Sequence, residues 1–238
     1  MFFMNKLFDF PYVVDIKEAK KIQEKLQTLL SFDFPYQDRD IDLIAGIDVS
    51  YNAEKEALAA VVVLDFPSLR VREVSWGKAS PSFPYIPGFL SFREGPAIEK
   101  ALSFLDSQPQ IFFFDGQGIA HPRGVGLATH LGILFGLVSV GVAKSNLVGN
   151  FEEPPKKQGS FSWIEYQGKK VGMALRTKEK VKPVFVSPGN KIDLENARRW
   201  TLLVTTKYRL PEPVRQAHIF SEKIKKGGKE EYGRYSFS

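Results

Sequence analysis

The order of apolar segments between residues 42 and 143 restricts the fold of this chain more than any other feature. Three runs of strand composition come first, followed by a segment of helical periodicity, an apolar strand, a second helix and a further strand. Short breaks favour an antiparallel meander for the first three runs, whereas helices between the later strands favour parallel pairing. An α/β fold with a mixed sheet flanked by helices is predicted. Its strands are residues 42–51, 57–65, 70–79, 110–115 and 138–143, and its helices are residues 96–105 and 125–136.

The rest of the chain adds elements on both sides of this region. Asp15 can cap a helix over residues 16–30, whose apolar residues recur at helical spacing, and this helix is expected to serve packing. Residues 222–238 are rich in charge and glycine and are predicted to be a flexible polar tail. No linker is visible, so residues 1–238 are expected to form one domain. Further predicted elements are a hairpin at residues 160–176, a short strand at 183–186, a helix at 191–205 and a short helix in PEPVRQAH.

Composition limits the classes of function that the chain can have. Its 238 residues include no cysteine, which excludes disulfides, cysteine zinc sites and a thiol nucleophile, so any metal must bind oxygen or nitrogen ligands. The longest apolar run is too short to span a bilayer and the N-terminus does not resemble a signal peptide. We therefore expect a cytoplasmic protein without a membrane partner. A monomer is also expected. The net charge of +6 indicates an acidic partner such as nucleic acid.

Three acidic residues stand at places where packing requires no charge. Asp48 lies late in LIAGIDVSY, Asp115 ends an apolar strand before a Gly-rich loop, and Glu94 lies after a Pro-rich loop at the start of the next helix. Singly, such acids are usually solvated, but the predicted element order would bring these three together. Carboxylates are preferred ligands of Mg²⁺, which can activate water and stabilise a leaving oxygen in phosphodiester cleavage. Asp48, Glu94 and Asp115 are therefore candidate ligands of Mg²⁺, for which Mn²⁺ is expected to substitute.

Basic residues near these acids are candidates for supporting roles. His121, in the Gly-rich loop, could activate water, protonate a leaving group or bind phosphate, although bonding to neighbouring carbonyls is the ordinary alternative. Lys144, at a strand end, could place positive charge at a scissile phosphate or could simply be solvated. His218, in PEPVRQAH, could join the metal site or serve a structural role. His130 lies among helix-spaced apolar residues and is expected to be a buried packing residue.

The loop FPYIPGF, residues 83–89, is unusual because two prolines brace Tyr85 and Ile86. A plain Pro-rich connector packed on the core is the ordinary interpretation. Proteins that extract a base from a duplex, however, need an aromatic or apolar side chain to replace the lost stacking. The braced Tyr85 is suited to that task.

The predicted element order is that of the ribonuclease H-like fold, in which acids from the first strand, the first helix and the fourth strand meet at one edge of the sheet. Between residues 43 and 218 the chain also resembles the endonuclease V family, the repair nucleases that recognise deaminated adenine. The resemblance rests on six blocks in the family order. They are IAGIDVSY, PYIPGFLSFREGP, DGQGIAHPRGVGLATHLG, VGVAKSNLVG, VSPGNKIDL and LPEPVRQAH.

This resemblance implies a Mg²⁺-dependent endonuclease that nicks double- or single-stranded DNA containing deoxyinosine. Cleavage would occur at the second phosphodiester bond 3′ to the lesion and leave 5′-phosphate and 3′-hydroxyl ends. By motif, the three acids would bind metal, and His121, Lys144 and His218 would support catalysis. Tyr85 would be the wedge that fills the space of the displaced base, and Ile86 beside it would also bind the substrate. The pocket for hypoxanthine would be lined, largely by backbone groups, at Gly88, Leu90 and Gly126.

Three other functions remain open on the sequence alone. An inosine-specific endoribonuclease would share every motif, since nothing in the sequence reads a 2′-hydroxyl recognisably. Another ribonuclease H-like nuclease, such as the C-terminal incision domain of the nucleotide-excision nuclease, would share the acids but not PYIPG. A non-catalytic binding module is opposed by the three acids, which would repel phosphate unless metal is present.

Overall fold

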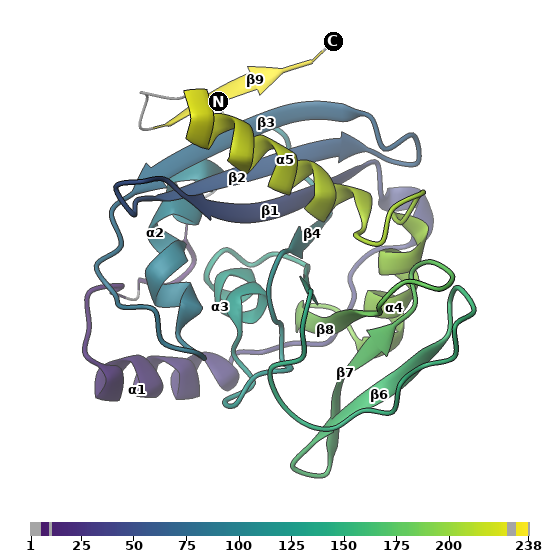
Figure 1. Ribbon diagram of the computed structural model, residues 1–238. Coiled ribbons are helices and arrows are strands. Elements are labelled where there is room, and N and C mark those ends of the chain that lie inside the picture. The colour runs from purple at the N-terminus through teal and green to yellow at the C-terminus, as the bar shows by residue number, and fades with distance from the viewer. Residues whose placement is uncertain (1–5, 10, 228–231, 238) are drawn as a thin grey trace.

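The computed structural model describes residues 6–9, 11–227 and 232–237, and these build one nine-stranded mixed sheet with helices on both faces (Figure 1). The strand order is β6-β7-β8-β5-β4-β1-β2-β3-β9. The ribonuclease H-like mixed α/β fold predicted from the sequence is confirmed. Within the described residues, no helix is long and apolar enough to cross a membrane.

The first three strands form the predicted antiparallel meander. They are β1 (Leu43–Tyr51), β2 (Ala57–Asp65) and β3 (Val71–Ala79), each within one residue of its predicted bounds. Strand β4 (Ile111–Phe114) then pairs in parallel with β1, and β5 (Ser139–Ala143) pairs in parallel with β4. Parallel pairing places the ends of β1 and β4 at the same edge of the sheet.

The helix before β4 begins earlier than predicted. Helix α2 spans Leu90–Ser103, so Glu94 lies within the helix and not at its start, and Pro96 is inside it. The sequence pattern favoured Pro96 as the first helical residue because proline is best tolerated there. The helix instead begins directly after the PYIPG turn, so Glu94 lies in the first two turns of the helix that follows it.

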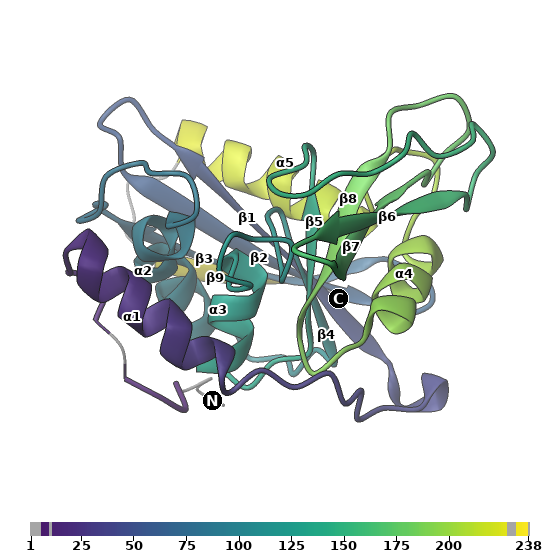
Figure 2. The ribbon, with the colours of Figure 1, turned by 90° about the horizontal axis from the view of Figure 1, so that it is seen from below.

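Helices α1 (Ile16–Gln27) and α3 (Leu127–Leu134) lie with α2 on one face of the sheet (Figure 2). As predicted, Asp15 caps α1 by accepting a hydrogen bond of 2.8 Å from the backbone N–H of Glu18. The second half of the sheet contains the predicted hairpin and a longer strand than expected at residues 184–190. The remaining elements are β6 (Phe161–Tyr166), β7 (Lys169–Leu175), β8 (Val184–Asn190), α4 (Leu194–Leu203) and a 3-10 turn at Asp38–Asp40.

Alternation along the strands divides the core between the two faces. Ala45 and Ile47 of β1 pack toward α1, α2 and α3, whereas Ile44 packs in the cluster that includes Trp200 of α4. All are nearly or fully buried. Both faces of the central strands are thus covered, which explains why β2 is apolar almost throughout its length.

Helix α5 (Glu212–Gly227) lies along β1 on the other face of the sheet from α2, as Figure 1 shows. The contact requires Gly46, because a Cβ there would lie 1.9 Å from the backbone oxygen of Pro213. The short helix predicted around PEPVRQAH is the beginning of this helix, which has 16 residues. Close packing at Gly46 carries the next turns of α5 over the C-terminal half of β1.

Much of the segment predicted to be a flexible polar tail is in regular structure. Residues 222–227 complete α5, and β9 (Tyr232–Ser236) pairs antiparallel with β3. Aromatic side chains explain the difference, since Tyr235 stacks on Trp76 at 4.9 Å and Tyr232 stacks on Phe104 at 4.2 Å between ring centroids. The tail prediction also covers residues 228–231 and 238, which lie outside the described part of the chain.

Candidate active site

Asp48 and Asp115 are brought together by the parallel pairing of β1 with β4. Ile47 is in register with Phe114, and the backbone N–H of Asp115 donates to the carbonyl oxygen of Ile47 at 2.9 Å. Asp48 and Asp115 directly follow this pair of residues, so the two acids lie side by side on neighbouring strands. This pairing explains how residues far apart in sequence meet at one edge of the sheet.

Helix α5 adds polar groups over Asp48. The hydroxyl of Ser221 donates to Asp48 Oδ2 at 2.7 Å, and His218 Nδ1 lies 3.1 Å from the same oxygen. Ligand atoms of Asp48, Asp115 and His218 lie within 4.8 Å of one another. The structure thus brings His218 to the acids and shows a group of three residues that could hold a metal ion.

Glu94 lies at the same cavity but outside that compact group. Its carboxylate is buried in α2 and accepts a hydrogen bond of 3.0 Å from the hydroxyl of Tyr51, which in turn accepts one from Arg93 Nε at 3.2 Å. Burial raises the pKa of Glu94 to about 8, against the opposing effect of the Tyr51 hydrogen bond. Glu94 is thus held at the site by a tyrosine that the sequence did not single out.

A cavity of about 260 Å³ joins these acids. Burial and the neighbouring Asp115 charge raise the pKa of Asp48 to about 6. A cation bound among carboxyl groups with raised pKa values stabilises their ionised forms. The oxygen-rich set of side chains therefore fits a hard divalent ion. The lining residues are Asp48, Val49, Ser50, Leu90, Glu94, Asp115, Lys144, His218 and Glu222.

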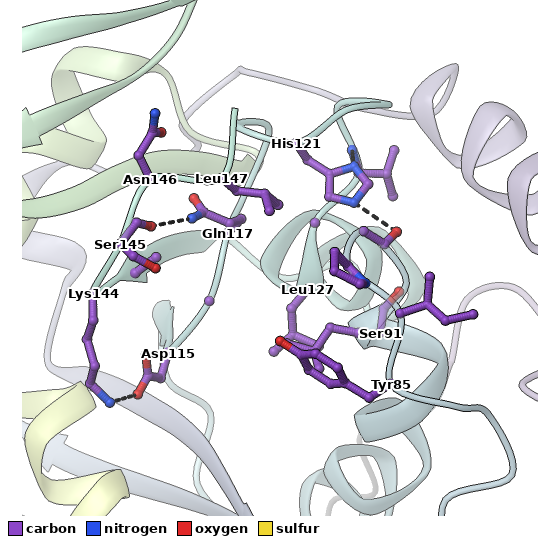
Figure 3. A pocket seen from close by; sticks show the side chains of 18 of the residues that line it. Tyr85, Ser91, Asp115, Gln117, His121, Leu127, Lys144, Ser145, Asn146 and Leu147 are labelled. Atoms are coloured by element: carbon purple, nitrogen blue, oxygen red, sulfur yellow. Dashed lines mark hydrogen bonds and ion pairs between the residues drawn. The ribbon is translucent and has the colours of Figure 1, made fainter. Parts of the chain in front are cut away.

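Lys144 follows β5 and forms an ion pair with Asp115 Oδ2 (Figure 3). Its backbone carbonyl accepts a hydrogen bond of 3.1 Å from Arg209 Nη2, which fixes the end of the strand. The ammonium group therefore lies at the acid cluster, as the strand order predicted. Glu222, by contrast, was assigned to the tail by the sequence, yet it lines the acid cavity because α5 continues to Gly227.

A second pocket, of about 350 Å³, adjoins the acid cavity and shares Leu90, Asp115 and Lys144 with it. Tyr85 and His121 lie across this pocket from Lys144 and Asn146 (Figure 3). Tyr85 is 72% exposed, as a presented side chain must be. All five residues predicted to bind the substrate line this pocket, namely Tyr85, Ile86, Gly88, Leu90 and Gly126.

His121 belongs to this pocket and does not line the acid cavity. Its Nδ1 accepts from the backbone N–H groups of Arg123 and Val125 at 3.2 and 3.3 Å, so Nε2 carries the proton and donates to the Gly88 carbonyl at 3.0 Å. Burial lowers the pKa of His121 to about 4. The His121 ring is thus neutral, and both of its nitrogens form hydrogen bonds with backbone groups of the pocket wall.

His130 is fully buried, as predicted, and its Nδ1 lies 2.9 Å from the hydroxyl of Ser91. Its ring meets Phe92 edge to face at 5.1 Å between centroids. Burial lowers the pKa of His130 to about 3. It packs between α3 and α2 behind the pocket.

Residues 20–219 match the family model described as Endonuclease V. The chain belongs to the endonuclease V family. An endonuclease V from Kosmotoga olearia is 46% identical over 90% of this chain and 93% of its own. The crystal structure of endonuclease V from Streptomyces avermitilis superposes with a TM-score of 0.86 at 40% identity, covering 90% of this chain and 95% of that one.

A structure of Ciona intestinalis endonuclease V, in complex with DNA containing an inosine followed by a ribo-adenosine, is similar at 30% identity and a TM-score of 0.79. The similarity covers 89% of this chain and 98% of that one. Family membership identifies this chain as a DNA-binding endonuclease, with the acid group as its candidate metal site.

Sequence reasoning missed the residues that act through long-range hydrogen bonds. Tyr51 and Ser221 hold the acids, while Gln23 of α1 lines the second pocket. The sequence carried only one signal for them, which is that Gln23 interrupts the apolar face of a helix assigned to packing.

Proposed function

We propose that this protein nicks DNA containing deoxyinosine, with Mg²⁺ as cofactor, at the second phosphodiester bond 3′ to the lesion. The products are 5′-phosphate and 3′-hydroxyl ends. One observation carries the proposal: the acid cavity and the pocket lined by the PYIPG loop meet at Leu90, Asp115 and Lys144. A base held in the pocket therefore has its backbone beside the acids.

In this proposal Asp48, Asp115 and His218 hold the metal ion, and Glu94 binds it directly or orients the attacking water. Bound there, a Mg²⁺ ion would supply an activated water and would neutralise charge at phosphorus and on the departing 3′ oxygen. Lys144 adds positive charge near Asp115, where the phosphate would lie. Ser221 and Tyr51 keep two of the carboxylates oriented through their hydrogen bonds.

The second pocket receives the displaced hypoxanthine. Tyr85 and Ile86, presented between prolines, take the place of the extracted base in the stack. Backbone groups at Gly88, Leu90 and Gly126 read the edge of hypoxanthine, whose N1–H and O6 distinguish it from adenine. His121 braces this pocket as a neutral ring, since both of its nitrogens already bond to the pocket wall.

Cleavage of inosine in RNA is the second candidate. The Ciona intestinalis enzyme was observed with a ribo-adenosine following the inosine, so a ribonucleotide is accommodated there in that protein. Matched inosine-containing DNA and RNA of one sequence, cleaved in Mg²⁺ at equal concentration, decide between the two. We expect faster cleavage of DNA, and a preference for RNA would overturn the assignment to DNA repair.

We further propose that the protein acts as a monomer in the cytoplasm, in the repair of deaminated adenine, and that Mn²⁺ can replace Mg²⁺. Oxygen ligands suit both ions. Nicking of inosine DNA with Mg²⁺, with Mn²⁺ and with EDTA tests the metal requirement. Activity that persists in EDTA would contradict it.

A further inference from the structure

Gln23 is a fully buried polar residue in α1, a helix whose other buried residues are apolar. Its Nε2 donates to the carbonyl oxygens of Gly88 at 3.0 Å and Val125 at 3.3 Å, and its Oε1 accepts from Arg123 Nε. These partners lie in two separate loops. One buried side chain therefore joins segments that are otherwise distant in the sequence.

The orientation of the Gln23 amide is fixed by its surroundings. Rotating the group by 180° would set Oε1 against two carbonyl oxygens and the NH₂ group against a guanidinium. Both arrangements are repulsive. The amide is therefore held in one orientation, with its two N–H groups and its oxygen all paired.

Gly88 is the point at which these bonds converge. Its carbonyl oxygen accepts from Gln23, from His121 Nε2 at 3.0 Å and from Arg123 Nη2 at 2.7 Å. Its φ of +82° is in the left-handed region that favours glycine, and a Cβ would lie 3.0 Å from Arg123 Nη2. Three donors on one oxygen prevent this peptide group from rotating.

Gln23 and Arg123 also connect the two walls of the pocket. Gly88 belongs to the PYIPG wall, whereas Val125 and Arg123 belong to the loop that follows β4. The Arg123 guanidinium lies over the Phe89 ring at 4.3 Å, on the PYIPG side. The separation of the two walls is thus set by Gln23, which lines the pocket, and by Arg123.

We propose that Gln23, together with Arg123, is a positioning residue that sets the width of the purine slot and thereby its selectivity for hypoxanthine. The inference rests on the proposed function of the pocket. Hypoxanthine and adenine have opposite hydrogen-bonding patterns at positions 1 and 6. Backbone groups reject the wrong pattern only when they are held in place, which is what the pinned Gly88 peptide provides.

Binding of single-stranded oligonucleotides tests this proposal. Fluorescence anisotropy in Ca²⁺ gives dissociation constants for an oligonucleotide with one deoxyinosine and for its deoxyadenosine counterpart. For Gln23→Leu we expect the preference for deoxyinosine to fall by about tenfold or more, with affinity for the deoxyadenosine strand unchanged within about twofold. A preference equal to that of the wild type, or equal losses for both strands, would overturn the proposal.

Ile22→Ala is the matched control, because it removes apolar packing from the neighbouring position of the same helix. It should lower the melting temperature but keep the preference for deoxyinosine. If Gln23→Leu does not fold, Arg123→Met replaces it, since that side chain is only partly buried and its loss removes bonds to both Gln23 and Gly88. Retained preference in Arg123→Met would overturn the proposal equally. A wild type without any preference would instead refute the proposed function.

Discussion

His218 and Asp48, 170 residues apart in the chain, are joined at 3.1 Å between the histidine Nδ1 and the carboxylate Oδ2. The contact exists because α5 packs on β1 at Gly46, so that one late helix completes a site begun by the first strand. The carboxylate that His218 meets is buried and lies beside a second acid. The candidate metal site is therefore a product of helix-on-strand packing as much as of the acids themselves.

Asp48→Asn should reduce Mg²⁺-dependent nicking by more than about 100-fold, because even residues that only orient metal ligands are worth about 10–100-fold. Asparagine keeps an oxygen to accept from Ser221, so the fold should be retained. Removing a buried charge next to Asp115 should leave the metal-free protein at least as stable as the wild type. Nicking rates and thermal unfolding in EDTA check both expectations, and a rate within about tenfold of the wild type would show that Asp48 is not a ligand.

Tyr51→Phe should move the pH profile of nicking upward. The Tyr51 hydroxyl donates to Glu94 and favours its ionised form, so its removal raises the pKa of Glu94 above its value of about 8. We expect the midpoint of the rising limb to shift by about one pH unit at low Mg²⁺, the size expected for one hydrogen bond to a charged group. Rates measured from pH 6 to 9.5 give the midpoint. An unchanged midpoint would mean that Glu94 does not titrate in the reaction.

The metal-free protein should lose stability as pH rises from 6.5 to 8.5. Burial raises the pKa values of Asp48 and Glu94 from 3.8 and 4.5 to about 6 and about 8, so the folded state binds more protons than the unfolded state across that interval. Stability then falls with rising pH until the folded-state pKa values are passed. His121 acts oppositely but only below pH 6.5, because its folded-state pKa is lowered to about 4.

Calorimetry in EDTA at pH 6.5, 7.5 and 8.5 measures this decline, with Glu94→Gln as the variant that should flatten it. Mg²⁺ should raise the melting temperature most at the highest pH, where both carboxylates are charged and repel each other without a cation. A stabilisation by Mg²⁺ that is the same at all three pH values would argue against a site built on these two acids.

Tyr85→Ala should weaken capture of inosine more in duplex DNA than in a single strand, where less stacking must be replaced. Stacking of a base on an aromatic ring is worth roughly 1–3 kcal/mol, so a loss of about 5–150-fold is expected on duplex. Tyr208→Ala, at another exposed tyrosine outside both pockets, serves as the control. Equal losses on the two substrates would refute the wedge role.

Local sequence patterns predicted the strands of the sheet well. They predicted poorly where helices begin and which distant residues pair by hydrogen bonds. The meander strands were found to within one residue because apolar alternation is a property of neighbouring residues. The start of α2 was misplaced by six positions, since Pro96 is an ordinary first-turn residue and only the PYIPG turn shows that the helix begins at Leu90. Element order, together with the family motifs, was enough to place Asp48 and Asp115 side by side.

Residues that support the site could not be predicted from local sequence. Gln23 reaches partners 65 and 102 residues away, and Ser221 reaches one 173 residues away. Composition also misled at the C-terminal end, where charge and glycine suggested a tail although Tyr232 and Tyr235 stack on earlier aromatic rings. Such contacts depend on tertiary packing, which neither periodicity nor spacing encodes.

The most direct test maps the nick made on an end-labelled duplex with one deoxyinosine, in Mg²⁺ and in EDTA, beside a duplex with deoxyadenosine at that position. A single break at the second phosphodiester bond 3′ to deoxyinosine, present only with Mg²⁺ and absent from the control duplex, is the predicted result. Breaks that persist in EDTA, or that occur equally in the control duplex, would contradict a metal-dependent acid site coupled to a purine pocket.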